Sequence, residues 1–71
     1  MRDARDGLAF ELKRRGFKQA AIANMAGLTE QQLSDIVNKR RKLDANEMFR
    51  LCEAMRIDDL NILFEAAQDS A

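Results

Sequence analysis

The apolar residues of this chain recur at spacings of three and four positions, the period of helices with one buried face. The clearest stripe consists of Met48, Leu51, Cys52 and Met55, at i, i+3, i+4 and i+7. No segment has the pattern of a strand, and there is no convincing internal repeat. The pattern therefore predicts an all-α domain with a small core.

Short polar side chains mark the helix starts. Thr29 with Gln32, and Asp44 with Glu47, have the spacing of capping boxes, in which each side chain bonds to the backbone N–H of the other residue. Asp58 is expected to cap a short last helix. The expected helices cover about residues 3–15, 18–26, 30–38, 45–55 and 59–64.

Gly16 and Gly27 mark helix ends, because glycine readily adopts the left-handed conformation that commonly follows a helix. Gly7 lies inside the first expected helix, where glycine costs about 1 kcal/mol relative to alanine. Two starts therefore stay open for that helix, one capped by Asp3 and a later one capped by Asp6. The apolar residues that directly follow the turns are expected to pack back on the core: Phe17, Leu28 and Ile57.

Residues 18–38 have the pattern of two short helices joined by a glycine-containing turn, a helix-turn-helix. The small side chain of Ala23 lets the two helices cross closely. In the second of these helices, Leu33, Ile36 and Val37 share the face that we expect to be buried. The opposite face is polar and suited to a major groove of DNA. Its residues are Glu30, Gln31, Ser34, Asp35 and Asn38.

The charges are unevenly divided, although the net charge is zero. Residues 1–42 contain ten Lys or Arg and five Asp or Glu, whereas residues 43–71 contain two Lys or Arg and seven Asp or Glu. Such asymmetry indicates that a basic face meets an anionic partner. A solvated loop is the alternative interpretation of the basic run at 39–42, although its place directly after the third expected helix favours phosphate binding.

The amino-acid composition limits the class of protein and the kinds of site that the chain can form. A chain with 46% hydrophobic and 34% charged residues is typical of a globular domain. The single cysteine, Cys52, is typical of a protein in a reducing compartment and fits core packing. No apolar run approaches the roughly 20 residues that a membrane span needs. The N-terminal residues are unlike a signal peptide. We therefore expect a cytoplasmic protein. Without histidine, paired cysteines or a glycine-rich phosphate loop, we expect no metal, no cofactor and no enzymatic activity.

Residues 19–43 resemble the helix-turn-helix of the phage repressor and Cro family, also called the XRE family. The matching positions are Gln19, Ile22, Ala23, Ala26, Gly27, Leu28, Thr29, Leu33, Ile36 and Asn38. The later segment LCEAMRIDDLNILF is similar to the fourth and fifth helices of that family. The resemblance covers about residues 8–66 and is greatest to short prophage-type regulators of bacterial chromosomes. It implies that residues 1–71 form a single domain, a compact five-helix bundle of the lambda-repressor-like type.

The resemblance also implies a transcriptional regulator, generally a repressor, that binds a double-stranded DNA operator as a homodimer. The positions implied to face base edges are Glu30, Gln31, Ser34 and Asp35. Those implied to contact phosphates are Lys18, Gln19, Asn38, Lys39, Arg40, Arg41 and Lys42. The chain departs from the family at Val37, Lys39 and Leu43, where glutamate, glycine and proline are common.

Two acids, Glu30 and Asp35, lie on the face that would meet an anionic polymer. A carboxylate can accept a hydrogen bond from cytosine N4, and Gln31 can pair with adenine. A carboxylate close to a DNA phosphate, however, is repelled by it unless the carboxylate has a hydrogen-bond donor. The alternative function is therefore a protein-interaction module, such as an anti-repressor or antitoxin, with weak or no DNA binding. The candidates for a dimer interface are Phe49, Leu60, Leu63 and Phe64.

Overall fold

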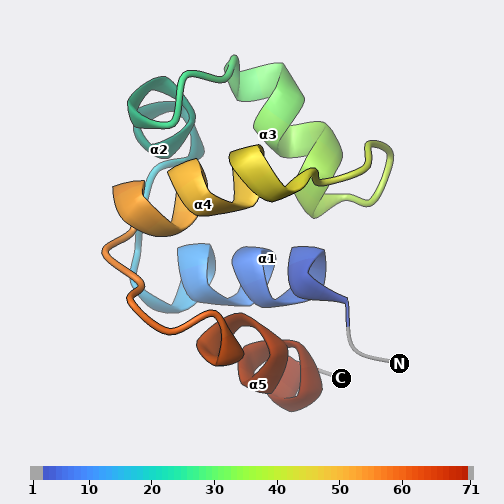
Figure 1. The fold of residues 1–71 in the computed structure, drawn as a ribbon. Coiled ribbons are helices and arrows are strands. Elements are labelled where there is room, and N and C mark those ends of the chain that lie inside the picture. Colours follow the sequence, from blue (N-terminus) through green and yellow to red (C-terminus); the bar gives the residue numbers. More distant parts are fainter. Residues whose placement is uncertain (1–2, 71) are drawn as a thin grey trace.

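Five helices occupy residues 3–70, the part of the chain that the computed structural model describes; side chains are described for residues 3–65 (Figure 1). The helices are α1 (Ala4–Arg14), α2 (Gln19–Met25), α3 (Glu30–Val37), α4 (Ala45–Ala54) and α5 (Asn61–Ser70). Helix α1 packs along α5 and against α3, while α2 packs against α3 and α4. In Figure 1, α2 and α3 lie at one end of the molecule and α5 at the other. The predicted all-α bundle is confirmed.

Both predicted capping boxes are present. The Thr29 hydroxyl accepts from the Gln32 N–H at 3.0 Å, and the Gln32 side chain accepts from the Thr29 N–H at 2.9 Å. Asp44 and Glu47 make the same exchange at the start of α4. The predicted cap of the last helix was wrong by one residue, because Asp59 rather than Asp58 accepts from the Asn61 N–H, at 2.9 Å. The last helix is also longer than expected and continues to Ser70.

The first four helices end in the same way, with one residue in the left-handed conformation. These residues are Gly16 (φ 70°), Gly27 (φ 75°), Lys39 (φ 62°) and Arg56 (φ 56°). The next residue then donates back into the last turn, as at Leu28 N–H to Ala23 O (2.8 Å), which satisfies carbonyls left open at the helix end. Only two of the four are glycines. The other two carry a Cβ into a conformation that costs about 1–2 kcal/mol.

Helix α1 begins at Ala4, and the side chain of Asp3 caps it by accepting from the Arg5 N–H at 2.9 Å. The alternative of a later start, capped by Asp6, was therefore wrong. Gly7 is buried inside the helix, and a Cβ placed on it would overlap the backbone carbonyl of Leu63 in α5. The missing side chain lets the two helix backbones approach closely, so the helix-propensity cost of glycine is offset by packing.

The core contains residues from all five helices. Helix α2 contributes Ile22 and Ala23. The largest fully buried side chains are Leu8, Leu33, Ile36, Leu51, Met55 and Leu63. Burial of Cys52 raises the pKa of its thiol by desolvation, as expected for a cysteine that packs rather than reacts. None of the helices that the structure describes has the length and apolar character of a membrane span.

Several packing predictions need correction. Phe17 is 37% exposed, so it does not pack in the core as expected. Val37 and Met48 are half-buried at the rim of the core. Leu63 was considered for a dimer interface, but within this chain it is fully buried.

Candidate nucleic-acid interface

The polar face of α3 lies beside the start of α2. Burial of Leu33 and Ile36 fixes the rotation of α3, which leaves Glu30 and Gln31 exposed on the opposite side and Ser34 and Asp35 half-buried. The structure brings together three of the predicted base-reading residues with one predicted phosphate-binding residue. Glu30, Gln31, Ser34 and Gln19 line one shallow hollow of about 370 Å³.

Asn38, which was predicted to bind phosphate, already takes part in ending α3. Its side-chain amide donates to the Ser34 carbonyl at 2.8 Å and lies 3.4 Å from the Ser34 hydroxyl. The Ser34 carbonyl also accepts from the backbone N–H of Asn38 at 3.0 Å, so Asn38 is bonded to the last turn of α3 through both its backbone and its side chain. Asn38 thereby connects the polar face of α3 to the loop that follows.

Asp35 connects the polar face of α3 to the loop that follows the helix. One carboxylate oxygen, Oδ1, accepts from the Gln31 side-chain amide at 3.0 Å and from Arg40 Nε at 3.1 Å. The backbone carbonyl of Asp35 also accepts from the N–H groups of Arg40 (2.7 Å) and Arg41 (3.2 Å). The carboxylate of Asp35 on the polar face of α3 is therefore paired with a cation, the Arg40 guanidinium.

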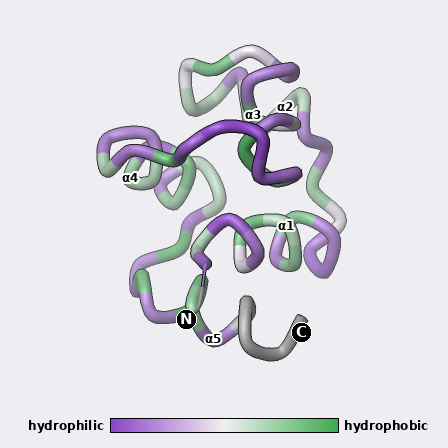
Figure 2. Tube along the Cα trace, turned by 90° about the vertical axis from the view of Figure 1, so that its right-hand side faces the viewer, coloured by the Kyte–Doolittle hydropathy of each residue, from purple (hydrophilic) through white to green (hydrophobic). Residues whose placement is uncertain are grey.

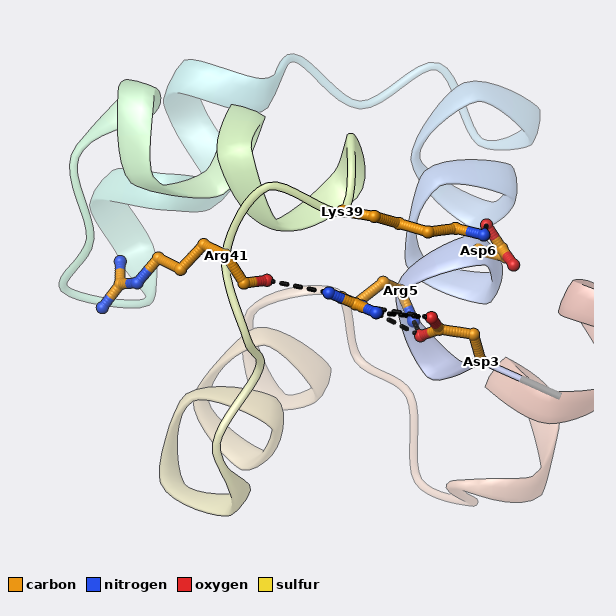
Figure 3. A network of polar contacts seen from close by, with 5 residues as sticks. All are labelled: Asp3, Arg5, Asp6, Lys39 and Arg41. Carbon is orange, nitrogen blue, oxygen red and sulfur yellow. Dashed lines mark hydrogen bonds and ion pairs between the residues drawn. The ribbon is translucent and has the colours of Figure 1, made fainter. Parts of the chain in front are cut away.

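The basic loop is the segment Lys39 to Lys42 between α3 and α4, and it forms a continuous hydrophilic stretch in Figure 2. It is anchored to the start of α1 (Figure 3). Lys39 Nζ pairs with Asp6 Oδ1 at 2.9 Å, and Arg5 Nη1 donates to the Arg41 carbonyl at 3.2 Å. These contacts hold the loop against a helix that is distant in sequence.

Arg5 is itself fixed by Asp3, through a 2.7 Å ion pair and further bonds from its Nε. The hydrogen bonds from Arg5 lower the pKa of Asp3 from 3.8 to about 2 and raise the pKa of Arg5. The carboxylate of Asp3 thus both caps α1 and orients the guanidinium that supports the loop.

The side chain of Arg41 points away from Arg5, as Figure 3 shows. Its Nη2 lies 2.7 Å from the carboxylate of Glu47, whose side chain is only 6% exposed. Its Nη1 is buried without a hydrogen-bond partner among the described residues. Arg41 therefore neutralises a buried acid in the second capping box, whereas Lys18 and Lys42 are exposed and form no ion pair among residues 3–65.

The sequence did not predict two of the acids that pair with the basic loop. The sequence marks Asp6 only as a possible helix cap and Glu47 only as half of a capping box, whereas the structure pairs them with Lys39 and Arg41. Asp6 is distant from Lys39 in sequence, and nothing in the local pattern indicates that pairing. A left-handed lysine at position 39, where the family commonly has glycine, directs the chain back toward α1 and makes the contact with Asp6.

The fold and this surface define a helix-turn-helix protein. A family model described as helix-turn-helix matches residues 8–59, most of the chain. The chain belongs to this family, the XRE-type helix-turn-helix DNA-binding regulators, and the resemblance seen in the sequence is confirmed. No curated protein and no solved structure gave a significant match to the chain.

Proposed function

We propose that this protein is a sequence-specific transcriptional repressor that inserts α3 into the major groove of a double-stranded operator. The observation that supports this most directly is the hollow shared by Gln19 and the exposed side of α3, because it joins a backbone-contacting position to base-reading positions on one surface. The basic loop and Lys18 border the same pair of helices.

The reading residues have distinct chemical roles in this proposal. Gln31 presents an amide, whose oxygen and N–H pair with N6 and N7 of adenine. Glu30 accepts from the N4 amino group of cytosine, and the hydroxyl of Ser34 serves as donor or acceptor. An acid in the groove rejects bases that present only acceptors, so Glu30 contributes selectivity at the expense of affinity.

Phosphate contacts come from both sides of α3. Lys18 and Gln19 lie at the start of α2, and Lys39, Arg40 and Lys42 follow α3. We assign Arg41 a supporting role instead, because its guanidinium lies against buried Glu47. Contacts of this kind fix the position of the protein on the duplex and carry no sequence information.

A homodimer is part of the proposal. Phe49 on α4 is 58% exposed, and Leu60 and Phe64 near α5 are half-buried, so each retains apolar surface for a second copy. Two copies related by a two-fold axis would place their α3 helices in successive major grooves. The half-sites would then be about 34 Å apart.

Selection of bound fragments from a pool of random duplexes, repeated over a series of salt concentrations, tests the proposal. We expect enrichment of a palindrome, with Gln31→Ala changing the base preferred at one position of each half-site and Lys42→Ala weakening binding to all sequences alike. Phe49→Ala should reduce dimer formation in sedimentation measurements. If no duplex were retained even at low salt, the proposal would be overturned and the protein-interaction module favoured.

A further inference from the structure

The carboxylate of Asp35 is already engaged before any DNA is present. Both of its side-chain hydrogen bonds fall on Oδ1, one from Gln31 and one from Arg40. We infer that Asp35 contacts no base itself and is a positioning residue, which orients Gln31 toward adenine and holds Arg40 at the border of the reading face. This inference rests on the proposed function and assigns a role within the same surface.

The orientation of the Gln31 amide follows from chemistry. An ionised carboxylate can only accept hydrogen bonds, so Gln31 must direct its NH₂ group toward Asp35. One N–H is then used at 3.0 Å, which leaves the amide oxygen and the second N–H free. These are one acceptor and one donor, the pair that adenine requires at N6 and N7. The Gln31 side chain is thus held with its recognition groups available, which reduces the cost of ordering it on binding.

Arg40 makes two hydrogen bonds to Asp35, one from its backbone and one from its side chain. Its backbone N–H donates to the Asp35 carbonyl at 2.7 Å, and its Nε donates to the Asp35 carboxylate at 3.1 Å. The two terminal nitrogens of this guanidinium make no hydrogen bond among the described residues, and the side chain is 60% exposed. Arg40 can therefore reach a phosphate while its charge offsets that of Asp35, so the acid does not simply repel the duplex.

A double-mutant cycle on DNA tests the inference. The probe is the duplex that the wild-type protein selects from a random pool, together with variants of that duplex at each base pair. We expect Asp35→Ala to relax the preference several-fold at the same base pair that Gln31→Ala affects. In the Gln31→Ala background, Asp35→Ala should cause no further loss at that pair, because its effect acts through Gln31. Asp35→Asn, which retains an oxygen acceptor, should preserve most of the preference.

A second readout uses the protein without DNA. The side-chain amide resonances of Gln31 and the Nε–H resonance of Arg40 should shift in Asp35→Ala, with little change in unfolding temperature. Glu53→Ala, which removes an exposed acid of α4, is the charge-matched control and should leave these resonances and the base preference unchanged.

The outcomes separate the two proposals. If the wild-type protein selects a sequence but the effects of Asp35→Ala and Gln31→Ala add independently, or fall on different base pairs, Asp35 reads a base directly and only this inference is overturned. If the wild-type protein selects no sequence, the proposed function fails and this inference fails with it. Unchanged Gln31 and Arg40 resonances in Asp35→Ala would also overturn the inference, whatever the protein does on DNA.

Discussion

Lys39 and Asp6 form an ion pair of 2.9 Å that joins the basic loop to α1. In the proposed complex with DNA, Asp6 would compete with phosphates for the Lys39 ammonium group. We expect Asp6→Ala to increase affinity for duplex DNA by about 1.4- to 5-fold at low salt, which corresponds to the roughly 0.2–1 kcal/mol typical of an exposed pair. Fluorescence anisotropy with a labelled duplex would measure it.

The matched control is Asp58→Ala, which removes an exposed acid in the α4–α5 connection and so changes the net charge equally. An equal increase for both variants would show that long-range charge, and not release of Lys39, governs the affinity.

Arg40 and Arg41 are neighbours with different expected contributions to stability. Arg41→Ala leaves the buried carboxylate of Glu47 without its cation, and we expect a loss of about 1–3 kcal/mol in the free energy of unfolding. Arg40→Ala removes an exposed pair and should change it by less than about 0.5 kcal/mol. Urea unfolding followed by circular dichroism distinguishes these values. Similar losses for the two variants would contradict the assignment of Arg41 as a structural residue.

The substitution Gly7→Ala should destabilise the protein, although helix propensity alone would favour alanine at this position. In an ordinary helix, Gly→Ala stabilises by about 1 kcal/mol. At position 7 the added methyl overlaps the Leu63 carbonyl, so α1 and α5 must separate, and we expect a net loss of about 1–3 kcal/mol. Ala9→Gly in the same helix is the control and should destabilise by about 1 kcal/mol through propensity alone. A Gly7→Ala protein that melts at a higher temperature than the wild type would refute the close contact.

Lys39 and Arg56 both adopt the left-handed backbone conformation, and replacing each by glycine allows a direct comparison. Arg56→Gly should stabilise the protein by about 1 kcal/mol, because glycine adopts a positive φ without strain. Lys39→Gly relieves a similar strain but also removes the pair with Asp6, so its gain should be smaller by about 0.2–1 kcal/mol. Thermal unfolding of both variants, with and without Asp6→Ala, would show whether the difference arises from that pair.

Much of the fold could be predicted because its signals are local. Capping boxes at Thr29 and Asp44, and the glycine stops at Gly16 and Gly27, depend on residues within one or two turns of each other. The last helix was placed less well, since Asp58 and Asp59 are equally good caps by type, and only the path of the chain after Ile57 selects between them.

The site was predicted less completely because its contacts are non-local. The face of α3 follows from periodicity, but the partners of the loop do not: the Asp6 pairing depends on how α1 lies beside the loop, and the role of Gly7 depends on how closely α5 approaches. The position of Asp35 between Gln31 and Arg40 could have been anticipated in part, since Gln and Asp at i and i+4 commonly interact on a helix.

The internal pairing of the basic loop has a thermodynamic consequence. Binding to DNA releases the cations condensed on each phosphate that a protein neutralises, so the logarithm of affinity falls with the logarithm of salt concentration by about 0.9 per phosphate. Lys39 and Arg40 are paired with the carboxylates of Asp6 and Asp35. A basic side chain that stays paired with a carboxylate when it meets a phosphate carries less net positive charge to the DNA, so fewer condensed cations are released. A DNA-binding protein with these pairs should remain bound to duplex DNA over a wider range of ionic strength than its number of basic residues suggests.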